Sequence, residues 1–327
     1  MFSGARHIAK LGATAILASS PMLSARLGRI ERAGALTILN FHRVDDRHLS
    51  SYSAIAPRHF DELVGWLKSR FRIVTFRDLG ELVPHGKPPL ILSFDDGYRD
   101  FVDVVAPILE RYGVAANQNV IPSSIETGRP PLNVILQDFI GQAPASLLKE
   151  ITITGLSSPL DPDDRSASGL SASAALKSRP IGEQKDIIAG LEAAFRKFDA
   201  FSTVPMLTLD HVRQVAGIHE IGAHSFEHAT MEAETADYLR ADAARCRDWF
   251  RRYLASEPEV YAFPNGSARP GQSEIVRDSG YQTVLLVGER FSRPQGWLHP
   301  RFTMYGDSAG ELRFRALGAL VGPGGSA

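Results

Sequence analysis

Two adjacent carboxylates end an apolar segment in the first third of the chain. In LILSFDDGYRD, residues 90–100, Asp95 and Asp96 follow the apolar run and precede Gly97. Neighbouring carboxylates repel each other and are rarely buried without an opposite charge, for which a metal ion is the simplest source. Gly97 permits a tight turn with the backbone close to a bound group. Taken alone, these residues fit an ordinary turn capped by an aspartate equally well.

Two histidines form a second group with possible chemistry. In HEIGAHSFEHATM, residues 219–231, His224 follows an apolar segment and His228 comes four residues later. Two imidazoles at this spacing can face one point if the loop makes a helical turn, as ligand pairs for a divalent metal often do. Together with the acidic pair they predict a site of two histidines and one carboxylate. The second aspartate is then free for proton transfer.

Alternating strands and helices surround both groups. Apolar runs predict strands, and apolar residues at helical spacing predict the helices between them. This βαβ alternation predicts a parallel sheet closed into a barrel, with functional groups gathered where the strands end. The predicted strands are 36–41, 71–76, 89–94, 219–224, 260–264 and 281–287, and the predicted helices are 58–71, 208–217, 233–254 and 271–280.

A different composition interrupts the alternation between residues 123 and 202. The centre of this segment, SSPLDPDDRSASGLSASAALKSRP, is rich in Ser and Pro and poor in apolar residues. Helical patterns flank it at 131–141 and 181–198. We expect a helical insertion with a flexible portion, acting as a lid or rim of the site.

The overall composition narrows the classes of function. The 327 residues are 44% hydrophobic, which allows one large catalytic domain with an insertion. Lys and Arg (36) nearly balance Asp and Glu (37), and no dense basic run occurs, so nucleic acid is not an expected partner. The single cysteine, Cys246, cannot form an internal disulfide and is interpreted as an inert thiol, which suits a reducing compartment.

The N-terminal segment, residues 1–34, allows two interpretations. Basic residues precede a short apolar stretch at 11–17, as in a weak signal peptide, but more basic residues follow it. The alternative is an amphipathic helix that lies on the domain or associates with a membrane surface. A cytoplasmic or membrane-peripheral location is favoured over export. Residues 311–327 are expected to form a C-terminal tail.

The paired motifs resemble those of a known family. SFDDG (93–97) followed by HSFEH (224–228) is similar to the first two motifs of the polysaccharide deacetylases, the NodB-homology domain of carbohydrate esterase family 4. The resemblance covers a domain at 35–310, outside the insertion at about 123–202. It implies an α/β fold of the distorted (β/α) barrel type, in agreement with the alternation of strands and helices.

The resemblance also implies roles for the residues in these motifs. The first aspartate of the family motif is the catalytic base, which here is Asp95. The second aspartate and the two histidines bind a divalent metal, commonly zinc, which here gives Asp96, His224 and His228.

A third motif of the family is altered in this chain. Where the family often has Arg-x-Pro-aromatic after a strand, YAFPNG places Ala262 at the arginine position. The resemblance then gives Phe263, Pro264 and Asn265 a part in shaping the substrate pocket, with the Asn265 backbone N–H directed at an oxyanion. Arg301 in WLHPRFTMYGD is the expected replacement for the missing arginine.

The altered motif moves the resemblance toward the branch that includes poly-N-acetylglucosamine deacetylases. In NFHRV, His42 ends the first predicted strand, and we expect it to be the catalytic acid. Its competitor is His299, which precedes Pro300 in a segment without an apolar run before it. That setting suits the rim of a pocket better than its floor.

These features together predict a metal-dependent hydrolase that removes N-acetyl groups from an amino-sugar glycan. A catalytically silent carbohydrate-binding or assembly protein of the same fold remains open, with Ala262 as its best support. A deacetylase that acts on O-acetyl esters or on a non-sugar amide also remains open. A serine hydrolase is disfavoured because the chain has no G-x-S-x-G motif. Poly-N-acetylglucosamine, chitooligosaccharides and other exopolysaccharides are all compatible substrates.

Overall fold

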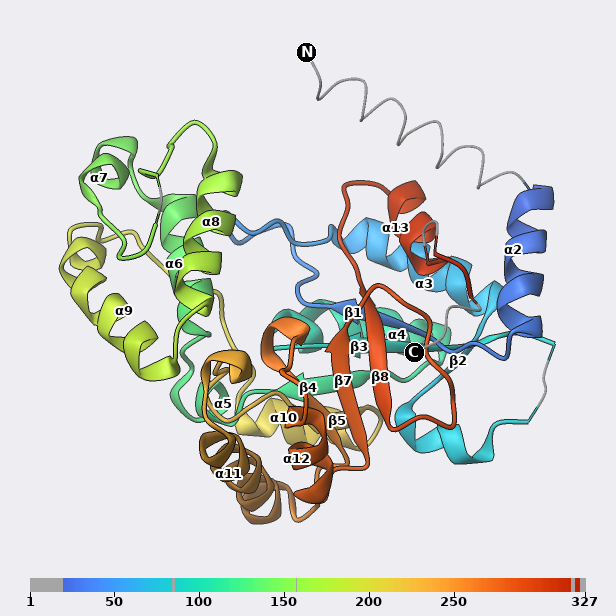
Figure 1. Cartoon of the computed structure of the whole chain (residues 1–327). Helices are drawn as coiled ribbons and strands as arrows, with labels where there is room; N and C mark the ends of the chain where they lie inside the picture. The colour runs from blue at the N-terminus through green and yellow to red at the C-terminus, as the bar shows by residue number, and fades with distance from the viewer. Residues whose placement is uncertain (1–19, 84–85, 157, 319–320, 324–327) are drawn as a thin grey trace.

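A ring of parallel strands forms the centre of the molecule (Figure 1). The computed structural model describes residues 20–83, 86–156, 158–318 and 321–323. The strands are β1 (Thr37–Phe41), β2 (Arg72–Val74), β3 (Pro89–Phe94), β4 (Asn117–Val120), β5 (Glu220–Ala223), β6 (Val260–Ala262), β7 (Thr283–Val287) and β8 (Leu298–Thr303). They pair in the order β1-β8-β7-β6-β5-β4-β3-β2.

The ring closes between β1 and β3. These two strands pair in parallel along their length, from Thr37 opposite Leu90 to Phe41 opposite Phe94. β2 pairs with the beginning of β3 and β4 with its end, so β2 lies outside a closed barrel of seven strands. The distorted (β/α) barrel predicted from the sequence is therefore confirmed.

Helices cover the outside of this barrel and build the insertion. In α3, Phe60, Leu63, Val64 and Leu67 are buried at helical spacing. The helices are α2 (Ser20–Arg32), α3 (Pro57–Arg70), α4 (Ala106–Tyr112), α5 (Pro122–Thr127), α6 (Leu132–Gln142), α7 (Ala145–Glu150), α8 (Arg165–Lys177), α9 (Ile181–Arg196), α10 (Leu209–Ala216), α11 (Ala236–Leu254), α12 (Gln272–Asp278) and α13 (Ala309–Ala316). Short 3-10 helices lie at Phe76–Glu81, Met231–Ala233 and Pro264–Gly266, and a π-helix lies at Phe101–Val105.

Residues that face the barrel interior change from apolar to polar along the strands. Side chains alternate between the two faces of a strand, so every second residue points inward. Near the amino ends one apolar cluster contains Leu36, Ile38, Ile91, Val260 and Leu285. Two residues further along β1 and β3, the same faces carry the buried polar residues Asn40 and Ser93. The carboxyl end of the barrel is therefore the polar end.

The insertion has its own apolar core, made by α6, α7, α8 and α9. Figure 1 shows these helices standing to one side of the barrel. The sequence-based expectation of a flexible centre is wrong for residues 165–177, which form α8. Small residues allow this helix to pack closely, because a Cβ at Gly169 would lie 1.9 Å from the Ser51 Oγ. Asp164 caps the helix by accepting a hydrogen bond from the Ala167 N–H.

The two ends of the described chain meet on one side of the barrel. The Arg26 guanidinium in α2 donates to the Leu317 carbonyl oxygen, and Leu312 and Ala316 of α13 are buried. The core therefore continues past residue 310, into the segment predicted to be a tail. Residues 1–19, which carry the predicted leader or surface helix, lie outside the described residues. No described helix is long and apolar enough to cross a membrane.

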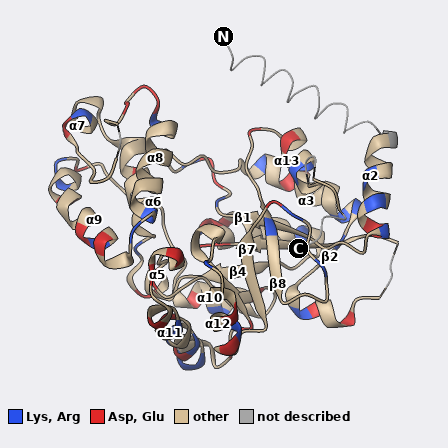
Figure 2. Ribbon diagram, in the orientation of Figure 1, with Lys and Arg blue, Asp and Glu red and all other residues tan. Residues whose placement is uncertain are grey.

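Charged side chains of both signs are interspersed over the outer helices. Figure 2 shows this mixing along α9, α11 and α12. It agrees with the formal net charge of −1 for the whole chain.

Candidate active site

A cavity of about 360 Å³ opens at the carboxyl ends of the strands. The loops after parallel strands meet at this end of a barrel, and active sites of such folds lie there. Residues that follow β1, β3, β5 and β6 line the cavity beside residues of the insertion. The strand-end residues are His42, Asp95, Asp96, His228 and Asn265.

Asp96, His224 and His228 converge at this cavity. The Asp96 Oδ1 lies 3.3 Å from the His224 Nε2 and 3.4 Å from the His228 Nε2. One ligand atom from each residue lies within 4.8 Å of the other two. The loop reaches this geometry without the helical turn that the sequence suggested, because Ser225 and His228 adopt left-handed backbone conformations with φ of 60° and 58°.

The three side chains fit a divalent cation. The His224 Nδ1 lies 2.8 Å from the Ala262 carbonyl oxygen, which only a protonated Nδ1 can bond, so the Nε2 lone pair is directed toward Asp96. Burial is the main cause that lowers the pKa of His228 to about 3, which keeps this imidazole neutral and able to coordinate. The Asp96 Oδ1 is buried without a hydrogen-bond partner among the described residues. A metal would satisfy it.

Asp95 is held by a bidentate ion pair with Arg301. The Arg301 Nη1 and Nη2 each lie 2.8 Å from one of the Asp95 carboxylate oxygens, and both side chains are at most 2% exposed. Burial alone would raise the pKa of Asp95, but the Arg301 guanidinium outweighs it and holds this pKa well below its usual range. Asp95 is therefore a fixed and ionised carboxylate.

Asn119 is a further partner of Asp95 that the sequence reasoning missed. Its Nδ2 donates to the Asp95 Oδ1 at 2.8 Å and lies 3.3 Å from the Ser93 Oγ. Gly222 in the neighbouring strand leaves the necessary space, since a Cβ there would lie 2.2 Å from the Asn119 Oδ1. The available signal was the run of three polar residues in NQNV, which is unusual for a buried strand.

Comparison with known proteins identifies the chemistry of this region. Residues 208–284 match the family described as polysaccharide deacetylase, a range that includes His224 and His228 but not Asp95 or Asp96. Over this range the chain is similar to the polysaccharide deacetylase family. The family resemblance and the enzyme class predicted from the motifs are thereby confirmed: the chain is a hydrolase that acts on carbon–nitrogen bonds other than peptide bonds. None of the curated protein sequences matches the chain.

Solved structures of deacetylases share the fold. They include Streptococcus pyogenes deacetylase PplD in complex with acetate, at 16% identity and a TM-score of 0.56, covering 86% of this chain and 98% of that one. IcaB from Ammonifex degensii has 18% identity and a TM-score of 0.56, with 86% and 97% covered. The de-N-acetylase from Aggregatibacter actinomycetemcomitans has 18% identity and a TM-score of 0.50, with 82% and 94% covered.

The two histidines considered for the acid role occupy different parts of this deacetylase. His42 lines the cavity, with its ring centroid 6.1 Å from that of Tyr52, and its Nδ1 has no hydrogen-bond partner among the described residues. His299 is fully buried in β8, where its Nδ1 lies 2.6 Å from the Ser292 Oγ and its ring packs near Phe76. The expectation that His299 lies on a rim is wrong, because it points into the apolar amino end of the barrel.

Of the three residues in the altered third motif that were predicted to shape the pocket, only Asn265 lines the deacetylase cavity. Asn265 has φ of 61°, and its backbone N–H has no acceptor within the part of the chain that the structure describes. Phe263 and Pro264 do not line the cavity, so the structure does not support their predicted contact with substrate. Phe263 belongs to the hydrophobic core and packs against the ring of Tyr261.

Backbone strain gathers around the same cavity. Asp96, Ser225, His228 and Asn265 all have positive φ although none is glycine. Each such conformation costs on the order of 1 kcal/mol or more and persists when the surrounding structure enforces it. The fold therefore maintains a locally unfavourable backbone where the ligand set and the cavity wall require it.

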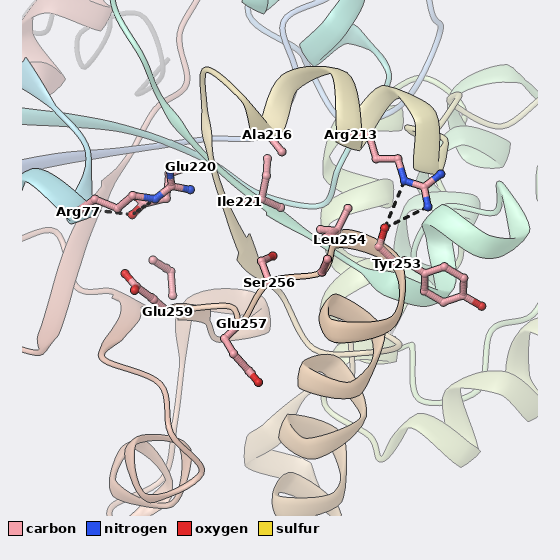
Figure 3. A pocket seen from close by; sticks show the side chains of 12 residues that line it. Arg77, Arg213, Ala216, Glu220, Ile221, Tyr253, Leu254, Ser256, Glu257 and Glu259 are labelled. Carbon is pink, nitrogen blue, oxygen red and sulfur yellow. Dashed lines mark hydrogen bonds and ion pairs between the residues drawn. The ribbon is translucent and has the colours of Figure 1, made fainter.

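A larger cavity, of about 760 Å³, lies at the amino ends of β5 and β6 (Figure 3). Glu220 sits there and accepts hydrogen bonds from the backbone N–H groups of Phe76 and Arg77, while the Arg213 guanidinium bonds the Tyr253 carbonyl oxygen. The Glu220 and Arg213 side chains are therefore engaged in contacts that hold neighbouring elements of the fold together. The one group of three residues arranged like metal ligands in the described part of the chain is at the other end of the deacetylase barrel.

Proposed function

We infer that this chain removes N-acetyl groups from an amino-sugar oligosaccharide or polysaccharide in a metal-dependent hydrolysis. The observation that carries this inference is a fixed, ionised Asp95 directly beside the converging set of Asp96, His224 and His228. A protein that only binds glycans needs no carboxylate held beside a metal-ligand set. Two structural neighbours support the acetyl group as the target, since one is a de-N-acetylase and the other was solved with acetate.

Asp95 is the proposed general base. A divalent cation at the ligand set, for which two histidines and one carboxylate favour zinc, supplies Lewis acidity toward the acetyl carbonyl and toward water. Asp95 then accepts a proton from the attacking water. The bidentate contact with Arg301 fixes the carboxylate in one orientation, and Asn119 holds one of its oxygens. Both contacts contribute the positioning that general base catalysis requires.

His42 and Asn265 are proposed to complete the reaction. The oxyanion that forms when water adds to the acetyl carbon needs a hydrogen-bond donor. The backbone N–H of Asn265, a residue of the cavity wall, has no acceptor among the described residues. Breaking the C–N bond then requires a proton on the departing amine. His42 lines the cavity without a partner for its Nδ1 and is proposed to donate that proton, giving acetate and a glucosamine-type product.

Acetate release from a panel of glycans tests the proposal. Chelated protein and protein reloaded with zinc are compared on N-acetylglucosamine oligomers, on the polymer, on O-acetylated glycans of matched length and on a non-sugar acetamide. We expect acetate from the N-acetylated sugars only, lost on chelation and restored by metal. Equal turnover by chelated protein would contradict metal dependence, and turnover confined to the O-acetyl esters or to the acetamide would contradict the substrate class.

A further inference from the structure

The helical insertion supplies one wall of the active-site cavity. Side chains from α6 and α8 line the same cavity as Asp95, Asp96 and His228. A barrel of this type can change its substrate by changing such added segments while the strand ends keep the chemistry. The insertion residues on this wall include Asn133, Gln137, Leu170, Ser173 and Lys177.

This wall is attached to the barrel rather than loosely hinged. The Ser51 N–H and Oγ both donate to the Gln137 carbonyl oxygen, at 3.0 and 2.9 Å. At the start of α9 the Ile181 N–H donates to the Glu234 Oε1 at 2.6 Å. Because α8 lies between these attachments and packs on α6, a residue at its end has a defined place over the cavity.

Lys177, the last residue of α8, is a cation on the cavity wall without an ion pair among the described residues. The other lining cation is Arg43, whose Nη2 lies 3.3 Å from the Asp45 Oδ2, while its Nε and Nη1 are buried without a partner in the described part of the chain. Among the described residues, the Lys177 ammonium has no hydrogen bond and no ion pair. It is partly buried, so an unpaired charge there is costly unless a ligand compensates it.

The charge of Lys177 adds to that of the proposed metal site. Lys177 lines the same cavity as Asp96 and His228, two of the three proposed ligands. A divalent cation beside the single carboxylate of Asp96 would leave one net positive charge, to which Lys177 would add a second. The part of the cavity next to the reacting acetyl group is therefore positive, which favours an anionic ligand.

We propose that Lys177 determines specificity by binding a carboxylate of the glycan next to the N-acetyl group that is removed. This inference rests on the proposed function and adds a substrate class to it. One ammonium matches the single negative charge of a carboxylate, whereas a phosphate ester carries up to two charges. A neutral glycan would leave the ammonium desolvated and unpaired, so the site discriminates against it.

Three tetrasaccharides of equal length test this assignment. One contains N-acetylglucosamine alone, one alternates it with N-acetylmuramic acid, whose carboxylate lies on an ether-linked lactyl group, and one alternates it with a hexuronate. For the carboxylate-bearing substrate that fits, Lys177→Met should lower kcat/KM by about 10- to 100-fold, mainly through KM, as expected for one charge-assisted hydrogen bond. The neutral tetrasaccharide should change by less than about threefold, and Lys177→Arg should retain most of the preference.

The matched control is Lys149→Met, which removes an exposed cation from α7 of the same insertion and should change none of these rates. An equal loss on neutral and acidic substrates, or no loss on either, would overturn the assignment. If no saccharide releases acetate, the proposed function fails, and calorimetry with the same saccharides still decides the role of Lys177. Carboxylate-dependent binding that disappears in Lys177→Met supports the assignment, and binding equal to that of the native protein overturns it.

Discussion

Each end of the barrel has a cavity with a buried carboxylate beside an arginine, but the two arrangements differ. At the carboxyl end, Arg301 is fully buried and binds both oxygens of Asp95. At the amino end, Glu220 is bonded mainly by backbone N–H groups, and the side chain of its partner, Arg77, is 57% exposed. Both arginines lower the pKa of the carboxylate beside them, but only the buried Arg301 outweighs the effect of burial.

The pKa values of the two carboxylates move in opposite directions. Burial raises the pKa of Glu220 to about 7, because the backbone N–H groups and Arg77 only partly offset the loss of water. Burial acts on Asp95 in the same direction, but Arg301 reverses the result. The amino-end cavity is also about twice as large, at 760 against 360 Å³. The arrangement of the charged groups, rather than the size of the cavity, distinguishes the site.

The same change from carboxylate to amide, made at each end, should give the largest contrast. Asp95→Asn removes the general base and should lower kcat by about 10²- to 10⁴-fold with the metal retained. Glu220→Gln should leave kcat and metal content unchanged. Acetate release and metal analysis on both variants, with folding checked by circular dichroism, measure this. Loss of metal from Asp95→Asn would mean that it is a ligand and not the base.

The two histidines allow a second contrast between the ends. His42→Ala should retain the metal and lower kcat by about 10²- to 10⁴-fold, because the leaving amine loses its proton donor. Added imidazole should restore part of the rate, since His42 lines the open cavity. His299→Ala should lower stability through the loss of a buried ring and change kcat little in the folded fraction. Abolished turnover in folded His299→Ala would place the acid at the amino end.

Substitution of Arg301 should have a smaller effect. Arg301→Lys keeps a positive charge but loses the paired contact with Asp95, so kcat should fall by about tenfold, equivalent to one charge-assisted hydrogen bond. Arg301→Gln removes the charge that lowers the pKa of Asp95, so that activity in acid should be lost at a higher pH than in the native protein. Identical pH–rate profiles would show that Arg301 does not set the state of Asp95.

Apolar segments made much of this fold predictable from the sequence. β3 was predicted with its observed bounds, Pro89–Phe94, because a continuous apolar run ends at two aspartates. β4 and β8 were missed because their inward positions are polar and reach into the carboxyl half of the barrel. α8 was predicted to be flexible because its Ala, Ser and Gly residues look unstructured, whereas they pack against α6 and Ser51.

Residues of the candidate site could likewise be predicted only where they follow an apolar strand. Asp95, Asp96 and His224 could be placed because each follows an apolar strand. Asn119 and Lys177 could not, because each belongs to an element that the apolar pattern did not predict. Arg301 was expected to replace the motif arginine because of the family resemblance, whereas its contact with Asp95 depends on β8 and β3 both pairing with β1, and such a long-range contact is not written in the local sequence.

Glu220 should also make folding stability depend on pH in a direction unusual for a carboxylate. Its pKa is about 7 in the folded protein and 4.5 ordinarily, so between these values the native state holds a proton that the unfolded state has lost. The free energy of unfolding should therefore fall as pH rises from about 4.5 to 7, by at most about 3 kcal/mol, and this group should add no further change above pH 7.

Glu220→Gln removes this dependence, because an amide does not ionise. Its single oxygen replaces only one of the two carboxylate oxygens that accept from the Phe76 and Arg77 N–H groups, so the variant also loses one hydrogen bond at every pH. The stability of the variant relative to the native protein should increase between pH 4.5 and 7, as measured by urea unfolding at a series of pH values. Glu126→Gln, an exposed change in α5, should give curves parallel to the native protein over this range. Parallel curves for Glu220→Gln as well would mean that Arg77 and the backbone N–H groups compensate the charge of Glu220 fully. The two ends of the barrel would then differ in geometry but not in how they hold a carboxylate.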